Sequence, residues 1–160
     1  MGFIEVITKI FGNKSQKDMR AVMPYVEKIK AVYAEIDALS DDELRARSAA
    51  LMQCLQDAVA THKTKIQELK TSIENIDIDK REKVYNEIDR LEKEVLDIYD
   101  KTLNDILPEA FAVVKSTARR FAHNETITVL ATQMDRDLAA DPRFDFVEID
   151  GDKAIYHNSW

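Results

Sequence analysis

An apolar heptad pattern runs along the middle third of this chain. Side chains recur at intervals of four or three residues from Leu44 to Ile76, alternating except for two successive fours at 51–59. A strict alternation follows from Val84 to Ile98, after a polar break at 77–80. Such a repeat aligns one stripe of a helix against a neighbouring helix. Two such helices joined by a short polar turn predict an antiparallel hairpin with arms of roughly 40 Å. The pattern consists of Leu44, Ser48, Leu51, Leu55, Val59, His62, Ile66, Leu69, Ile73 and Ile76, then Val84, Ile88, Leu91, Val95 and Ile98.

Helical signals continue on both sides of this hairpin. Residues 15 to about 39 carry a broad apolar stripe, although Pro24 is expected to kink or break that helix. Ser40 and Glu43 have the spacing of a capping box at the start of the first arm. Pro108 is expected to end the second arm and to open a further helix. The stripe before the hairpin consists of Val22, Tyr25, Val26, Ile29, Val32, Tyr33 and Ile36.

The residues after about position 123 change in character. β-branched residues at 126–130 indicate a strand, and 135–140 suit a short helix. Asp150-Gly151-Asp152 is a hairpin signal between two further strand-like runs, 144–149 and 153–156. The expected fold is therefore mainly α: a long antiparallel heptad hairpin plus flanking helices, with a small C-terminal β-hairpin or three-stranded sheet.

The charge of the chain is unevenly distributed. The formal net charge is −7, which argues against a general nucleic-acid binder. Residues 1–30 hold six basic and three acidic side chains, so this start carries +3 and the remainder −10. A basic start suggests an anionic partner. The single cysteine, Cys54, rules out an internal disulfide and favours a reducing cytosol, and no signal peptide or membrane-spanning run is recognised.

Residues 3–11 are the sharpest candidate site. On a helical wheel their apolar side chains share one face, with Glu5, Thr8 and Lys9 opposite, and Gly12-Asn13 ends the helix. One hypothesis is an amphipathic anchor in the plane of an anionic membrane. The other is a helix docked on its own core or on a second subunit. The residues assigned to membrane contact are Phe3, Ile4, Ile7, Lys9, Ile10, Phe11, Lys14 and Lys17.

No catalytic constellation is recognised in the sequence. His62, His123 and His157 lie far apart, and no two have metal-ligand spacing on one helix. His62 on the heptad seam is better explained as a polar residue that sets hairpin register, and Cys54 as a packed thiol. Neither GxxxxGK[ST] nor GxGxxG occurs. We therefore expect no catalytic, cofactor-binding or metal-binding residue in this chain, and no ATP hydrolysis by it alone.

Three segments carry a family resemblance. They are Ile-Thr-Lys-Ile-Phe-Gly at 7–12, Leu-Ser-Asp-Asp-Glu-Leu-Arg-Ala-Arg-Ser at 39–48, and Leu-Pro-Glu-Ala-Phe-Ala-Val-Val-Lys at 107–115, which continues as Ser-Thr-Ala-Arg-Arg-Phe at 116–121. In this order they resemble the start of the SecA family, the motor ATPases of bacterial preprotein secretion. The resemblance implies a parent protein that binds ATP and Mg²⁺ on helicase-like motor domains and drives unfolded preproteins through a SecY-type channel.

The same resemblance implies further expectations. It adds contacts with the channel and with a second subunit to the membrane hypothesis for the N-terminal helix. The expected partners include anionic lipid and exclude nucleic acid, and a homodimer is an open alternative. It implies a cytoplasmic protein bound peripherally to the inner face of the cell membrane, and it marks the hairpin as an insertion. The expected units are an amphipathic helix at 1–12, a helical region at 15–56, the inserted coiled-coil hairpin at 57–104, a helix leading toward a motor domain at 105–122, and a β-rich appendage at 123–160.

A second class of function remains open from the residues alone. The heptad hairpin would equally suit a free-standing coiled-coil module that binds another helix or dimerises. The role of the hairpin itself is not indicated by any motif.

Overall fold

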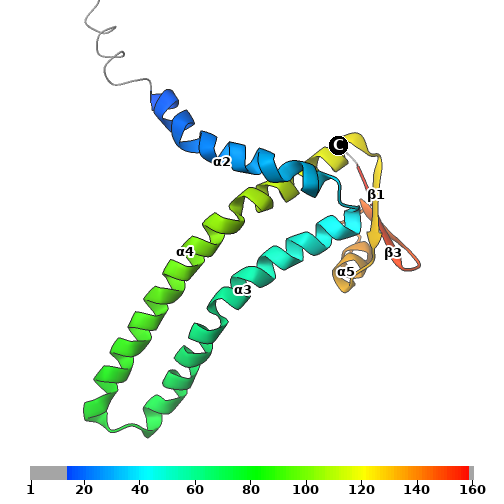
Figure 1. The fold of residues 1–160 in the computed structure, drawn as a ribbon. Helices are drawn as coiled ribbons and strands as arrows, with labels where there is room; N and C mark the ends of the chain where they lie inside the picture. Colours follow the sequence, from blue (N-terminus) through cyan, green and yellow to red (C-terminus); the bar gives the residue numbers. More distant parts are fainter. Residues whose placement is uncertain (1–13, 159–160) are drawn as a thin grey trace, which may run out of the picture.

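The computed structural model describes residues 14–158, which form long helices followed by a small sheet (Figure 1). The predicted helix at 1–12 lies outside the described residues. A mainly α fold with a small three-stranded sheet is confirmed. In chain order the elements are α2 (Lys14–Asp37), α3 (Asp41–Ser72), a 3-10 turn (Ile73–Asn75), α4 (Ile78–His123), β1 (Thr126–Leu130), α5 (Gln133–Ala140), β2 (Val147–Asp150) and β3 (Lys153–His157).

The antiparallel hairpin is formed by α3 and the first part of α4, which lie side by side in Figure 1. Its core contains Val59 and Ile66 from α3, and Ile88, Leu91 and Val95 from α4, all buried. Every one of these residues belongs to the predicted heptad pattern, so the seam is confirmed over this stretch. Burying each such side chain contributes about 1.5–3 kcal/mol, which offsets the entropy of ordering two arms that otherwise face water.

The expectation that Pro108 ends the second arm is wrong. α4 runs without interruption for 46 residues and contains Pro108. Proline in a helix interior removes one backbone hydrogen bond and costs about 3 kcal/mol. Here apolar packing continues on both sides of it, through Val95 in the hairpin and Ala112 and Val113 beyond. Burial on both sides holds the helix together across the proline. The break considered at Pro24 is absent in the same way, because α2 is continuous across it.

A second core lies where α2 crosses the upper part of α4. Ile36 of α2, Leu44 of α3, and Ala112 and Val113 of α4 are buried together. Ile29, Val32, Tyr33, Leu39 and Leu51 pack around them. The start of α3 is fixed locally, because Ser40 accepts a hydrogen bond from the Glu43 backbone and the Glu43 side chain accepts one from the Ser40 backbone. The predicted capping box is therefore present, and it sets the corner between α2 and α3.

The C-terminal sheet is antiparallel, with strand order β1-β3-β2. Ile127 and Val129 of β1 and Ala154 of β3 form its buried face, against which Phe121 at the end of α4 packs. Gly151 in the turn between β2 and β3 has a φ of 62°, a conformation that favours glycine. Of the two alternatives for this region, the three-stranded sheet is the one observed.

Candidate functional site

The residues assigned to membrane contact lie at or beyond the edge of the described structure. Phe3 to Phe11 lie outside it, and Lys14 is the first residue of α2. Lys17 is exposed in the same helix. The membrane assignment therefore stays a prediction. Among residues 14–158, no helix is long and apolar enough to cross a membrane.

The three histidines lie on three different elements, His62 on α3, His123 at the end of α4 and His157 at the end of β3. His62 on α3 lies 3.5 Å from the Glu94 carboxylate on α4, so it makes a polar contact across the hairpin. His123 and His157 contact groups in their own neighbourhoods. Cys54 is exposed, so the packed thiol expected from the sequence is wrong. It adjoins the seam residue Leu55 and lines an open hollow with Thr102 of α4. In the described part of the chain, no three His, Cys, Asp or Glu side chains are grouped to hold a metal.

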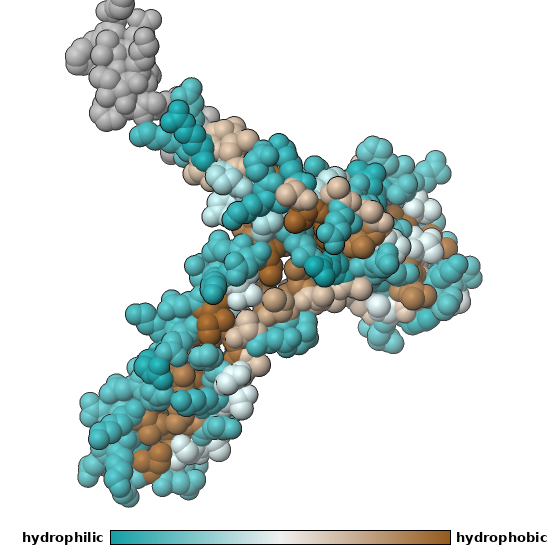
Figure 2. Space-filling model, viewed as in Figure 1, coloured by the Kyte–Doolittle hydropathy of each residue, from teal (hydrophilic) through white to brown (hydrophobic). Residues whose placement is uncertain are grey.

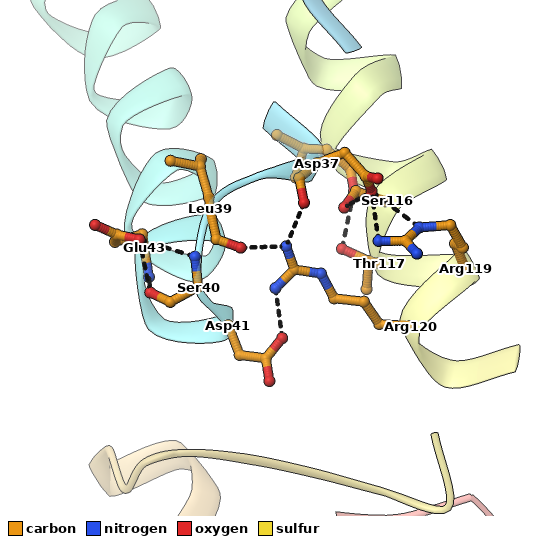
Figure 3. A network of polar contacts seen from close by, with 10 residues as sticks. Asp37, Leu39, Ser40, Asp41, Glu43, Ser116, Thr117, Arg119 and Arg120 are labelled. Atoms are coloured by element: carbon orange, nitrogen blue, oxygen red, sulfur yellow. Dashed lines mark hydrogen bonds and ion pairs between the residues drawn. The ribbon is translucent and has the colours of Figure 1, made fainter. Parts of the chain in front are cut away.

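The structure instead concentrates polar groups at the corner between α2 and α3, where α4 ends (Figure 3). We call this the corner network. The Arg120 guanidinium is buried there and donates to Asp41 Oδ1 at 2.5 Å and to the Leu39 carbonyl at 2.5 Å. A longer contact of 3.4 Å reaches the Asp37 carbonyl. Arg120 thus joins the C-terminal end of α2 to the first turn of α3. Its positive charge is favourable at the C-terminus of α2, and the Asp41 carboxylate is favourable at the N-terminus of α3, because of the helix dipoles.

Asp37 forms the other half of the corner network. Its Oδ1 accepts a hydrogen bond from Ser116 Oγ at 2.8 Å and one from Arg119 Nε at 3.0 Å. The Ser116 hydrogen bond lowers the pKa of Asp37 the most, partial burial opposes this, and Arg119 adds to the lowering. The carboxylate is therefore charged at neutral pH and ties α2 to α4.

A second group of polar residues joins α3 to the sheet, and we call it the sheet clamp. Its centre is Asp135 in the first turn of α5, whose side chain is fully buried. Arg45 Nη2 lies 2.5 Å from Asp135 Oδ1, and the Tyr156 hydroxyl donates to the same oxygen. The backbone and hydroxyl of Thr132 donate to Oδ2 at 2.7 and 2.8 Å. One carboxylate therefore caps α5 and also binds α3 and β3.

Burial alone would raise the pKa of Asp135. The hydrogen bonds from Arg45, Tyr156 and Thr132 outweigh that effect and hold this pKa well below its usual value. Arg45 also donates to the Leu130 carbonyl at 3.2 Å, and the Leu130 amide donates to Asp42 at 2.9 Å. Two charged side chains from the first turns of α3 therefore hydrogen-bond to the backbone at the end of β1.

A hollow of about 510 Å³ lies between the corner network and the sheet clamp. Asp41, Arg45 and Arg120 border it, and most of its remaining lining is apolar, including Leu44 and Phe121. A further apolar hollow of about 340 Å³ follows along α3 and α4. The sequence patterns do not single out Arg45, Arg120 or Asp135. The one available signal is that both arginines lie within the segments 39–48 and 116–121, which carry the family resemblance.

In the corner network the Ser116 hydroxyl lies beside the Asp37 carboxylate, and the lowered pKa of Asp37 makes this carboxylate a weak base. The charged groups of the site are paired with one another, and Asp37 and Asp135 are both stabilised in the ionised form. The arrangement is suited to fixing the relative positions of three helices and a sheet.

Comparison with known proteins identifies the family of the chain. A family model described as the SecA DEAD-like domain matches residues 7–134. The protein translocase subunit SecA of Porphyromonas gingivalis is 54% identical over 160 residues, which is 100% of this chain and 14% of that protein. The same subunit of Parabacteroides distasonis is 52% identical, and that of Flavobacterium psychrophilum 49%, again over the whole chain and 14% of each relative.

The chain therefore spans about 14% of the length of the curated relatives that it matches. The similarity covers the hairpin region as well as the segments 7–12, 39–48 and 107–121. No solved structure matches the chain.

Proposed function

The chain belongs to the SecA family, and from this premise we propose that it forms the N-terminal region of an ATP-driven translocase subunit that moves preproteins through a SecY-type channel. The observation that carries this proposal is identity of about half to relatives named protein translocase subunit SecA, along all 160 residues. The same observation favours this function over a free-standing coiled-coil module, because the similarity extends through the hairpin and the sheet alike.

We propose two contributions of this region to the subunit. The first is a scaffold, supported by the corner network and the sheet clamp, which fix α2, α3, α4 and the sheet relative to one another. The second is contact with anionic lipid and with the channel through residues 3–17. A cytoplasmic location at the inner face of the membrane follows from that contact. Homodimer contact through the same segment is the alternative use of its apolar face.

ATP and Mg²⁺ belong, in this proposal, to parts of the subunit outside these 160 residues. The support is that neither phosphate-binding pattern occurs in the sequence. We expect the purified chain to show no saturable ATP turnover above the buffer rate. Turnover that saturates with ATP and disappears on removal of Mg²⁺ would place catalysis here and overturn this division of labour.

The membrane contact is tested by flotation with vesicles of anionic or neutral lipid. The full chain is expected to float with anionic vesicles and to be released as salt is raised, because Lys9, Lys14 and Lys17 interact with the headgroups. Deletion of residues 1–11 removes the inserting side chains and is expected to abolish flotation. Unchanged flotation of the deleted chain would end the anchor hypothesis.

A matched pair of variants separates the apolar face from simple charge. Ile7→Asp and Thr8→Asp add the same charge at neighbouring positions of the predicted helix. Ile7 lies within the apolar face, and Thr8 lies about 100° round the helix from it, outside that face. Only Ile7→Asp is expected to reduce flotation, because it puts a charge on the face that enters the lipid. Equal losses from both variants would point to net charge alone and would contradict an inserted face.

A further inference from the structure

The apolar stripe of α2 is covered along only part of its length. In the second half of the helix, Ile36 is buried, and Ile29, Val32 and Tyr33 pack around the same core. In the first half the apolar side chains are left open to solvent. Met19 is 57% exposed, Val22 53%, Met23 39% and Tyr25 41%.

The exposed and the covered residues belong to one continuous stripe. Val22, Val26, Ile29 and Tyr33 follow one another at intervals of four, three and four residues, which keeps them on one helix face. Figure 1 shows the first half of α2 extending past α4, and Figure 2 shows apolar surface exposed there. A stripe that continues beyond its covering element indicates a further occupant, because uncovered apolar surface of this kind marks an interaction site.

We propose that this occupant is residues 3–11 of the same chain, folded back as a helix against the first half of α2. The segment is joined to α2 by only Gly12 and Asn13, and both residue types accept the positive φ that reverses the chain after a helix. Its nine residues span about 14 Å as a helix, and the stretch 14–26 of α2 spans about 20 Å. The segment is therefore long enough to cover about two thirds of this stretch. The apolar face it would contribute consists of Phe3, Ile4, Val6, Ile7, Ile10 and Phe11.

The short link also sets the register of this pair. In an antiparallel pair of helices, residues at similar distances from the reversal face each other. The proposed pairing would therefore place Ile7 near Met19 and Phe3 near Val22. Arg20 follows Met19 but lies 100° further round α2, away from the stripe, and so provides a control position.

Docking on α2 and insertion into lipid use the same apolar face of residues 3–11. The two states exclude each other, so a membrane must compete with α2 for the segment. This consequence rests on the proposed membrane function, whereas docking in the absence of lipid does not. The region would then keep its anchor covered in solution and release it at an anionic surface.

Disulfide cross-linking in the full chain tests the docking. In a Cys54→Ser background, the pair Ile7→Cys with Met19→Cys is compared with Ile7→Cys and Arg20→Cys. Met19 and Arg20 are both exposed, so neither change disturbs the buried cores. A disulfide requires Cβ atoms close together and correctly directed, so we expect the Met19 pair to form an intramolecular bond about tenfold faster than the Arg20 pair.

The outcomes separate the possible occupants. Equal intramolecular rates for the two pairs would indicate a segment without a fixed partner and would overturn the proposal. A covalent dimer as the main product would identify a second copy as the occupant, and would overturn it too. Anionic vesicles are expected to slow disulfide formation in the Ile7→Cys, Met19→Cys variant. If this variant floats with the vesicles and its rate of disulfide formation is unchanged, the competition between α2 and lipid is refuted. Failure to float, with rapid cross-linking retained, would refute the membrane function and leave the docking intact.

Discussion

Arg119 and Arg120 are adjacent in the sequence but occupy different environments. The Arg119 side chain is 46% exposed and pairs with Asp37 at the surface. The Arg120 side chain is 10% exposed and donates hydrogen bonds to Asp41 and to two backbone carbonyls. An exposed ion pair contributes little because water screens it, whereas removing one partner from a buried group leaves the others unsatisfied.

We predict that Arg120→Met lowers the free energy of unfolding by about 2–4 kcal/mol, because Asp41 and the corner carbonyls lose their donor. Arg119→Met is the matched control and is expected to cost less than about 1 kcal/mol. Urea denaturation followed by far-UV circular dichroism measures both. Equal losses would contradict the central position given to Arg120.

The sheet clamp adds a pH dependence at Asp135. Its pKa in the folded chain lies below the value of about 3.9 for an unfolded aspartate, so its contribution is complete above that value and is lost as the pH falls toward the folded pKa. We predict that Asp135→Asn costs about 2–3 kcal/mol at pH 7. The difference in unfolding free energy between the variant and the native protein narrows below about pH 4, because the Asp135 carboxylate then stabilises the native fold less.

Asp137→Asn makes the same charge change in the same short helix, at an exposed position. It is expected to alter stability by less than about 0.5 kcal/mol at either pH. Urea denaturation at pH 7 and pH 3 gives the comparison. A cost for Asp135→Asn that stays constant down to pH 3 would rule out the ionised carboxylate as its source.

Among the helices, α4 has one apolar face that is buried in the hairpin and other apolar side chains that are exposed to solvent. Leu91 is 3% exposed within the hairpin core, and Leu96, five residues later in the same helix, is 67% exposed. The core apolar residues appear in Figure 2 between the polar surfaces of the two arms. The heptad spacing specifies which leucine is buried, since helix periodicity places these two on different faces.

We predict that Leu91→Ala destabilises the chain by about 2–5 kcal/mol, because it opens a cavity between the arms. Leu96→Ala removes the same atoms from a solvated position and is expected to cost less than about 0.5 kcal/mol. Thermal and urea unfolding of both variants measure this difference. Similar costs would show that the arms do not pack through the seam.

At the scale of the whole molecule, the apolar cores are separate along the structure. The hairpin core, the core around Ile36 and Val113, and the core of the sheet share no buried residue. The corner network and the sheet clamp both lie at the end of the molecule away from the hairpin turn. The junction that carries the scaffold is therefore independent of the outer part of the hairpin.

We predict that replacing residues 57–104 by a short flexible link leaves the junction folded. Hydrogen exchange of backbone amides in β1 and β3 is the measurement, because their protection requires the sheet to stay closed. Protection equal to that of the full chain is expected. Loss of protection in the sheet would show that the outer hairpin supports the junction. Preprotein transport by the truncated parent protein then tests whether the hairpin has a required role.

Local patterns were sufficient for much of this fold. The heptad intervals, the Ser40–Glu43 capping box and the Gly151 turn are each specified by residues a few positions apart, so the hairpin, the start of α3 and the β2–β3 turn were all predictable. The exposed Cys54 and the continuous helix at Pro108 were not predicted. At Pro108, packing between elements overrides a local preference. Cys54 is exposed because it belongs to neither of the cores formed by α3.

The helical hairpin, its seam and the strand-rich tail follow from local patterns, because periodicity and turn chemistry act over one or two turns of chain. The way in which these parts are joined is visible only in the folded chain. Arg45 and Asp135 are separated by 90 residues and Arg120 and Asp41 by 79, and no local spacing links such partners. The tertiary structure also decided how much of the α2 stripe is covered, because that depends on where α4 passes beneath it. The corner network and the sheet clamp consist of charges that are paired between distant segments. They could therefore be identified only in the folded chain.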